Sequence, residues 1–231
     1  MSISNNDLQA VIRKSLKLDR ADQVNESLVS QEKVFKLTTE FQSQSTKTAH
    51  IELYQRYIES FNRVSSELDT VNRLEVNSNS SQFRSLKQDE TYNMNAVYLH
   101  ELYFANISDI HSNIAMDSLA YMRLARDFGD FDKWQADFIA CALSARCGWA
   151  VTYFNMYTQT YMNAFIDLHS LQVPVGCIPV VVMDVWQHAY YRDYLSDVKT
   201  FTYAMMKELN WEIIESRIKK TEKIASVMRA Q

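Results

Sequence analysis

The stretch that decides the fold is CIPVVVMDVWQHAYYRDY, residues 177–194. Its first part, CIPVVVMD, is a short continuous apolar run that ends in an acid, a pattern typical of a strand buried on both faces. Its second part, VWQHAYYRDY, returns to a helical composition. The chain therefore has a buried strand that leads directly into a helix, and Asp184 and His188 stand at that junction.

Two further strands are expected upstream of this stretch. GWAVTYFNMY, residues 148–157, and QTYMNAFIDLH, residues 159–169, are rich in aromatic and β-branched residues. Helical patterns flank them in the segments MDSLAYMRLARDFG, FDKWQADFIACALSAR and VKTFTYAMMKELNWEIIESRIKK. We therefore predict an α/β domain over residues 116–231 with a small three-stranded sheet.

The first half of the chain predicts a pair of long helices. From about Thr46 to Leu74 the apolar and aromatic positions recur at intervals of three and four. They are Leu53, Tyr54, Tyr57, Ile58, Phe61, Val64 and Leu68. Residues 76–90, rich in Asn and Ser, predict a loop, and a second helix is expected from about Tyr92 to Ser112.

Two long helices joined by a polar loop indicate an antiparallel hairpin, assigned to residues 36–115. Residues 1–35 are polar and predict an extension outside the main core, with a short amphipathic stretch that suits docking. The predicted fold class is therefore α+β, a long antiparallel helical hairpin followed by an α/β lobe.

Composition limits the classes of function. The chain has 231 residues, 47% of them hydrophobic, but only three Gly and two Pro, which favours long helices over a many-stranded sandwich. A formal net charge of −4 without a basic stripe argues against a nucleic-acid interface. We see no apolar run long enough for a membrane span and no signal-peptide pattern, so neither a membrane nor secretion is expected.

The three cysteines indicate a reducing environment. Cys141, Cys147 and Cys177 are odd in number, have apolar neighbours and lack the spacing of metal ligands. We interpret them as small buried thiols of a cytoplasmic protein, or of a virion-associated one if the source is a phage.

The chain has five histidines, and each can be considered in turn. His188 follows Asp184 by four residues, so both groups can be directed at one point, although that spacing is common by chance. His50 and His100 fall on the two helices of the predicted hairpin, where a lone histidine is more often a core residue. His169 is either a loop histidine or an outer group of a metal site. Together, three imidazoles and one carboxylate would suit iron, manganese or zinc.

The fifth histidine, His111, is expected near the end of a helix. There a cation is favourable in its own right, and we assign the residue no role in a site.

Several motifs now resemble one family. DVWQHAYYRDY is similar to the pattern Asp-x-Trp-Glu-His-Ala-Tyr-Tyr of the iron/manganese superoxide dismutases. The segments CGWAV (147–151), DFGDFDKWQADF (127–138), LNWEII (209–214) and VYLHELYFANI (97–107) resemble further parts of that family in the same order. The resemblance covers about residues 36–220 and implies a helical hairpin followed by an α/β lobe with a three-stranded antiparallel sheet.

Carried over residue by residue, the resemblance implies a metal site. The implied ligands are His50, His100, Asp184 and His188. His169 matches a position whose side chain is hydrogen-bonded to metal-bound solvent in some members. Tyr57 resembles the gateway tyrosine, Tyr191 the tyrosine of the dimer contact, and Trp149 and Trp186 the aromatic wall of the pocket.

The implied activity is conversion of superoxide to oxygen and hydrogen peroxide by redox cycling of one iron or manganese ion per chain. We expect iron rather than manganese because of His169, although closely similar sites take either metal. Arg192 and Lys199 are candidates for a positive mouth that attracts the superoxide anion. A homodimer or higher oligomer is expected.

Several positions depart from the common family pattern. Gln187 stands where a glutamate normally pairs with the partner subunit, which puts the strength of that contact in doubt. Tyr54 occupies approximately the position of a histidine in the family pattern. The gateway tyrosine, Tyr57, comes seven residues after the ligand His50, whereas common members place it eight residues after. Phe104 replaces a tryptophan, and Ala96 stands where some members carry the glutamine that reaches the solvent.

These departures keep two other functions open. One is a superoxide-dismutase-like structural subunit of a larger assembly, such as a virion or a ribosome, that keeps the metal site. The other is a different metal enzyme. Retention of four buried polar groups argues against a purely structural part, because such groups are costly when unpaired.

Overall fold

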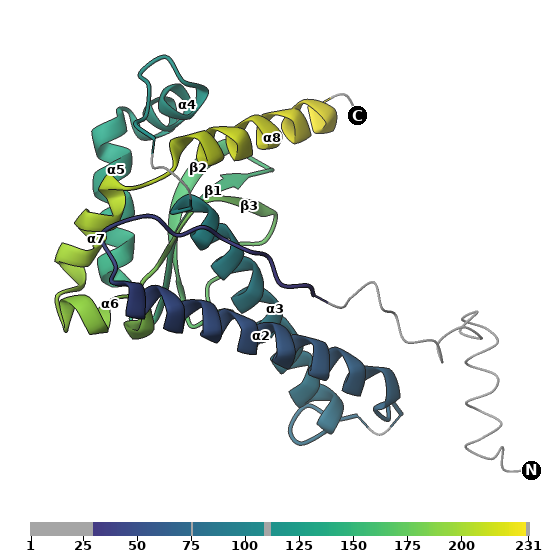
Figure 1. Ribbon diagram of the computed structural model, residues 1–231. Coiled ribbons are helices and arrows are strands. Elements are labelled where there is room, and N and C mark those ends of the chain that lie inside the picture. The colour runs from purple at the N-terminus through teal and green to yellow at the C-terminus, as the bar shows by residue number, and fades with distance from the viewer. Residues whose placement is uncertain (1–29, 75, 109–111, 230–231) are drawn as a thin grey trace, which may run out of the picture.

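The computed structural model describes residues 30–74, 76–108 and 112–229 and shows a helical hairpin beside an α/β lobe (Figure 1). The hairpin consists of α2 (Gln44–Thr70) and α3 (Gln82–Asn106). The lobe contains α4 (Leu119–Phe128), α5 (Phe131–Ser144), β1 (Gly148–Asn155), β2 (Thr160–Asp167), β3 (Cys177–Asp184), α6 (Gln187–Tyr194), α7 (Val198–Lys207) and α8 (Trp211–Arg229). The predicted α+β class is confirmed. The division into three domains at residues 35 and 115 stays a prediction.

The second helix of the hairpin is longer at its start than its sequence indicated. It begins at Gln82 rather than near Tyr92, because the Ser81 hydroxyl accepts a hydrogen bond from the backbone N–H of Arg84 and caps the first turn. Much of the predicted loop 76–90 is therefore helical. The helix ends at Asn106 and not at Ser112. The cluster of Asn and Ser predicts a loop, but one of these residues, Ser81, caps a helix.

The sheet is antiparallel, in the order β2-β1-β3. The central strand β1 is the one buried on both faces, while the first three residues of β3 are only partly buried. The prediction that the apolar run CIPVVVMD is fully buried is thus right only for its second half. In the register, Trp149 of β1 lies opposite Asp184 at the end of β3. That end lies beside the hairpin, because Asp184 contacts His50 of α2.

A strap before α2, residues 30–43, lies along the hairpin (Figure 1). Ser30 exchanges backbone hydrogen bonds with the side chain of Asn62, at 2.8 and 3.0 Å. Phe35 packs on Phe104, with ring centroids 5.4 Å apart. The described end of the predicted extension, residues 30–35, is therefore in contact with the hairpin. The amphipathic stretch predicted further upstream, and His111, lie outside the described residues.

One partly buried arginine joins three elements of the core. The Arg217 guanidinium, on α8, donates hydrogen bonds to the carbonyls of Leu102 on α3 (2.9 Å) and Val180 on β3 (3.0 Å), and to the side-chain oxygen of Asn106. Burial lowers its pKa to about 10. The same Asn106 donates to the carbonyl of Val182 at 2.9 Å. These bonds hold the hairpin against the edge of the sheet.

The approach of β2 to β1 requires glycine at position 148. A Cβ atom there would lie 1.8 Å from the carbonyl oxygen of Ile166, which is backbone and cannot move away alone. We expect Gly148→Ala to lower the free energy of unfolding by at least about 3 kcal/mol, because the strand pairing must shift. Urea unfolding followed by circular dichroism measures this.

Gly176→Ala is the matched control. Its Cβ would meet the ring of Tyr157, a side chain that is 77% exposed and free to turn aside, so the main cost is the positive φ of 69°. That cost is about 1–2 kcal/mol. Equal losses in the two variants would show that β1 and β2 tolerate the extra methyl group.

Candidate metal centre

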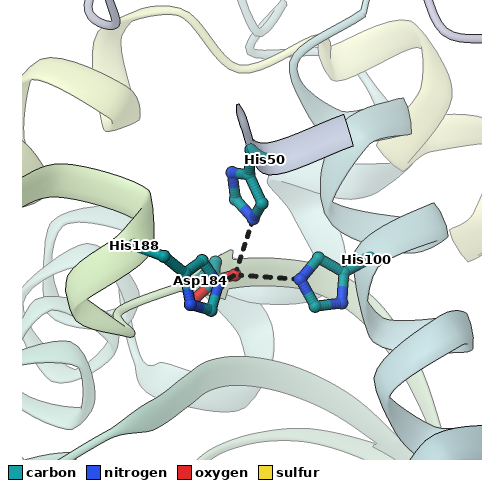
Figure 2. Close-up of side chains that lie close together, drawn as sticks. All are labelled: His50, His100, Asp184 and His188. Atoms are coloured by element: carbon teal, nitrogen blue, oxygen red, sulfur yellow. Dashed lines mark hydrogen bonds and ion pairs between the residues drawn. The ribbon is translucent and has the colours of Figure 1, made fainter. Parts of the chain in front are cut away.

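Four side chains from four elements meet beside the end of β3 (Figure 2). They are His50 of α2, His100 of α3, Asp184 of β3 and His188 of α6, and their potential ligand atoms all lie within 4.8 Å of one another. The structure therefore brings together all four residues that the resemblance implied as ligands. Residues 134 positions apart, His50 and Asp184, are in direct contact.

One carboxylate oxygen is the centre of the cluster. Oδ2 of Asp184 lies 3.0 Å from Nε2 of His50, 3.1 Å from Nε2 of His188 and 3.6 Å from Nε2 of His100. The other oxygen, Oδ1, accepts the backbone N–H of Trp186 at 2.8 Å. His50, His100 and Asp184 are buried, whereas the His188 side chain is 25% exposed. The cluster is therefore reached from solvent on the His188 side.

The protonation of His100 follows from its partners. Its Nδ1 lies 2.7 Å from the carbonyl oxygen of Ala96, so Nδ1 carries the proton and donates it. Its buried Nε2 then has a lone pair and no hydrogen-bond partner, and it faces the Asp184 carboxylate. A lone pair aimed at a carboxylate is unfavourable by itself, and a cation between the two groups removes that conflict.

Burial favours the neutral forms of His50 and His100, and the neighbouring histidines keep the Asp184 carboxylate ionised. Desolvation lowers the pKa of His50 and, more strongly, that of His100. Burial by itself raises the pKa of Asp184, but His188 and His50 outweigh it, and the pKa lies well below its usual range. Neutral imidazoles and an ionised carboxylate are the forms that bind metal. Three nitrogens and one carboxylate oxygen form a donor set that fits iron, manganese or zinc.

His169 lies in the turn after β2 and is fully buried. Its Nδ1 accepts the indole N–H of Trp149 at 3.0 Å, so Nε2 carries the proton and donates it to the hydroxyl of Tyr57 at 2.9 Å. Asn95 of α3 donates to the His169 carbonyl at 2.9 Å and ties the turn to the hairpin. His169 therefore stands beside the cluster, with its proton directed at Tyr57.

Tyr57 borders the cluster from α2. Its ring centroid is 5.4 Å from that of His100, and burial is the main reason why its pKa is raised. Tyr57 lies seven positions after His50, about two helical turns, so both side chains reach the same side of α2. The structure thus places the predicted gateway residue at the cluster despite its shifted spacing.

Aromatic rings enclose the cluster. Trp149 meets the His100 ring edge-on, at 4.9 Å between centroids, and Trp186 stacks on His169 at 5.0 Å and on His188 at 5.8 Å. Phe104 contacts the His50 ring at 5.0 Å. A dry, apolar wall strengthens the electrostatic interactions inside it.

The departures from the family pattern have a structural account at Tyr54. Its hydroxyl donates to a carboxylate oxygen of Glu101 at 3.0 Å and accepts the backbone N–H of Lys33 at 3.2 Å. The other carboxylate oxygen of Glu101 pairs with the Lys33 ammonium. Tyr54 is therefore bound to the strap and to α3. Glu101 was not predicted, and no sequence signal pointed to it.

The surface residues of the prediction lie on α6 and α7. Gln187 is exposed and accepts from the thiol of Cys147 at 3.1 Å, and Tyr191 is 54% exposed. Arg192 and Lys199 are exposed too, next to acidic neighbours on their own helices. Their roles in a dimer contact or a positive mouth stay predictions.

Tyr92 of α3 is a residue at the site that the sequence reasoning missed. Its ring centroid lies 4.7 Å from that of His169 and 6.4 Å from that of Tyr57. A signal was available: Tyr92, Ala96 and His100 follow at intervals of four, so they share one side of a helix. The expected loop over residues 76–90 concealed it by placing Tyr92 at the very start of α3.

In the described part of the chain, no helix combines the length and apolar character that crossing a membrane needs.

Comparisons with known proteins agree with the resemblance. A family profile described as the C-terminal domain of iron/manganese superoxide dismutases matches residues 117–217. An iron superoxide dismutase of Aquifex aeolicus is 29% identical over 179 residues, which cover 76% of this chain and 83% of that protein. Manganese superoxide dismutase 2 of Halobacterium salinarum is 30% identical over 161 residues, or 70% and 78%. Manganese superoxide dismutase 1 of Haloferax mediterranei is 33% identical over 124 residues, or 52% and 85%.

The buried His169 predicts a specific loss of stability in acid. Burial lowers its pKa from 6.5 in the unfolded chain to about 4, so between these values the unfolded chain binds more protons than the folded one. Acidification through this range should destabilise the metal-free protein by up to about 1.4 kcal/mol per pH unit from this residue alone. His169→Gln lacks the group and should lose stability less steeply.

Urea unfolding of both metal-free proteins between about pH 7 and about pH 5 checks this expectation. His50 and His100 titrate in both proteins, so the difference between the two slopes isolates His169. Parallel slopes would contradict a buried neutral imidazole at position 169.

Proposed function

Because the chain belongs to the iron/manganese superoxide dismutase family, we propose that it converts superoxide to oxygen and hydrogen peroxide at the cluster of His50, His100, Asp184 and His188. The observation that carries this proposal is the convergence of three imidazole nitrogens on one oxygen of a buried carboxylate. The unpartnered lone pair of His100 leaves that arrangement incomplete without a cation.

The four residues would hold one iron or manganese ion. A bound ion of either metal supplies a one-electron redox couple, which takes an electron from one superoxide and gives it to the next. Asp184, whose pKa lies well below its usual range, contributes the one negative charge among the four residues. The Ala96 carbonyl fixes the ring of His100, and the Trp186 N–H fixes the carboxylate.

His169 and Tyr57 have supporting roles at the opening. Trp149 holds His169 in the tautomer that donates to Tyr57, and Asn95 holds its backbone. The Tyr57 hydroxyl is thereby kept in place between the cluster and solvent, where it can hydrogen-bond a bound anion. The aromatic rings around it exclude bulk water.

Within this function we favour iron over manganese, on the basis of His169. A buried imidazole that donates outward differs from a carboxamide in basicity, and groups outside the ligand set tune the potential of a metal. Loading the metal-free protein with each ion in turn, and comparing the specific activities, tests this choice.

We further propose a homodimer or higher oligomer built on the surface of α6, supported by the exposure of Gln187 and Tyr191. Sedimentation equilibrium tests this, and a monomer at micromolar concentration would contradict it. A cytoplasmic location is favoured by three free cysteines, all only partly buried, since reducing compartments keep thiols free. Cell fractionation tests it. No feature of the described residues favours the alternative, a structural subunit of a larger assembly.

His188→Ala tests the ligand set and the activity together. We expect bound metal to fall from about one ion per chain to less than about a tenth, and dismutation to fall at least about a hundredfold, because one of four ligands is lost. Metal analysis after desalting and a superoxide-decay assay measure both quantities.

His169→Gln is the matched control, a neighbouring histidine outside the ligand set. It should keep its metal while its activity changes. Wild-type dismutation by His188→Ala would overturn the proposed site, and metal-free wild-type protein that cannot be loaded with iron or manganese would overturn the proposed function.

A further inference from the structure

Two of the four candidate ligands stand on α2 and α3, so the metal centre depends on how these two helices are held together. The hydrogen bond from Nδ1 of His100 to the Ala96 carbonyl lies within α3. It orients the imidazole on its own helix but does not hold that helix against α2. A rotation of α3 about its axis would carry Nε2 of His100 away from Asp184. A contact between the two helices close to the ligands prevents this.

Tyr54 and Glu101 supply that contact. Tyr54 lies four residues after His50, one turn along the same side of α2. Glu101 directly follows His100 on α3. The Tyr54 hydroxyl donates to a carboxylate oxygen of Glu101 at 3.0 Å, and the buried Tyr54 ring lies 6.4 Å from the His100 ring, between centroids. The hydrogen bond therefore joins α2 to α3 beside both ligands.

Lys33 completes this contact from the strap. Its ammonium pairs with the other carboxylate oxygen of Glu101, and its backbone N–H donates to the Tyr54 oxygen at 3.2 Å. Two positions further on, the Phe35 ring packs on Tyr54 and on Phe104, with centroids 6.2 and 5.4 Å apart. One residue of the strap thus contacts a residue of each helix, and the next aromatic ring covers the pair.

Burial on one side makes this ion pair matter. Exposed ion pairs usually contribute little to stability. The Lys33 side chain is 63% exposed, however, whereas the Glu101 side chain is only 10% exposed. Loss of the ammonium would leave a nearly buried carboxylate with the Tyr54 hydroxyl as its remaining donor, which is unfavourable. Movement of Glu101 towards water would relieve this cost, and it would turn α3 and displace His100.

We propose that Lys33 is a positioning residue of the metal centre, which fixes α3 through Glu101 and thereby keeps His100 directed at the cluster. The inference rests on the metal site of the proposed function and deepens it, because it makes the strap a determinant of how long the protein retains its metal. Lys33 acts through Glu101 and not on the bound ion itself.

Lys33→Met tests the inference in the metal-loaded protein. We expect the metal to leave about tenfold faster than it leaves the wild type, the effect of one lost charge-assisted hydrogen bond. Release into an excess of a chromogenic chelator, followed by absorbance, measures this rate for zinc as well as for iron or manganese. Lys36→Met is the matched control, the same substitution at an exposed lysine three positions along the strap. It should release its metal at the wild-type rate.

Two further variants separate this role from general damage to the strap. Lys33→Arg keeps a cation beside Glu101, and its metal should leave within about twofold of the wild-type rate. In the double variant Lys33→Met with Glu101→Gln, the carboxamide oxygen still accepts the Tyr54 hydroxyl but carries no charge. The rate should therefore return most of the way to that of the wild type. A strap that only covers the hairpin would show neither recovery.

Cobalt provides a second readout that does not depend on activity. The visible absorption bands of a bound cobalt(II) ion respond to the arrangement of its ligands. In the cobalt-loaded protein these bands should shift in Lys33→Met, stay unchanged in Lys36→Met, and return towards the wild-type positions in the double variant.

The outcomes distinguish the inference from the function on which it rests. A wild-type release rate in Lys33→Met, or equally fast release in Lys36→Met, overturns the inference and leaves the dismutase proposal intact. A double variant that loses its metal as fast as Lys33→Met overturns the action through Glu101. An inactive wild type whose zinc release still depends on Lys33 overturns the proposed function and supports the positioning role.

Discussion

The structure depends on the pairing of one buried carboxylate. Asp184 is fully buried, and an unpaired charge in a protein interior costs several kcal/mol. The groups that approach it come from α2, α3 and α6, so the hairpin, the edge of the sheet and the following helix have to meet at one point. The cluster is therefore both the candidate metal centre and a junction between the two parts of the fold.

Groups further out determine how the four side chains are oriented. The register of β1 with β3 sets Trp149 opposite Asp184, and the same tryptophan holds His169. Gly148 precedes Trp149 in β1. The carbonyl of Gly148 accepts the backbone N–H of Val185, the residue after Asp184, at 2.9 Å. One end of the β1 strand thus fixes the carboxylate, the aromatic wall and the outer histidine together, which explains why a close strand approach is needed there.

The sequence predicted the elements and the ligand set better than the contacts around them. The junction at Asp184 and His188 was visible because an apolar run ends there, and the helical stripe of α2 was visible in its periodicity. Helix caps and buried polar pairs depend on single side chains, so Ser81 was read as part of a loop. Tyr92 stands four residues before Ala96 and eight before His100, a spacing that the expected loop concealed. Glu101 depends on a contact with Lys33, 68 positions away, and no local pattern reveals it.

The four residues of the cluster and the residues that surround them are under different constraints. This difference explains why the departures from the family pattern fall on the surrounding residues. The four inner groups must each present one atom to the same small volume, so a change in any one of them leaves a buried charge or lone pair without a partner. Tyr54 has only to bury its ring against Phe104 and satisfy its hydroxyl. It does so through Glu101, whose charge Lys33 neutralises from the strap. The strap is therefore part of the support of the site, because without it a nearly buried carboxylate one residue from His100 would lose its cation.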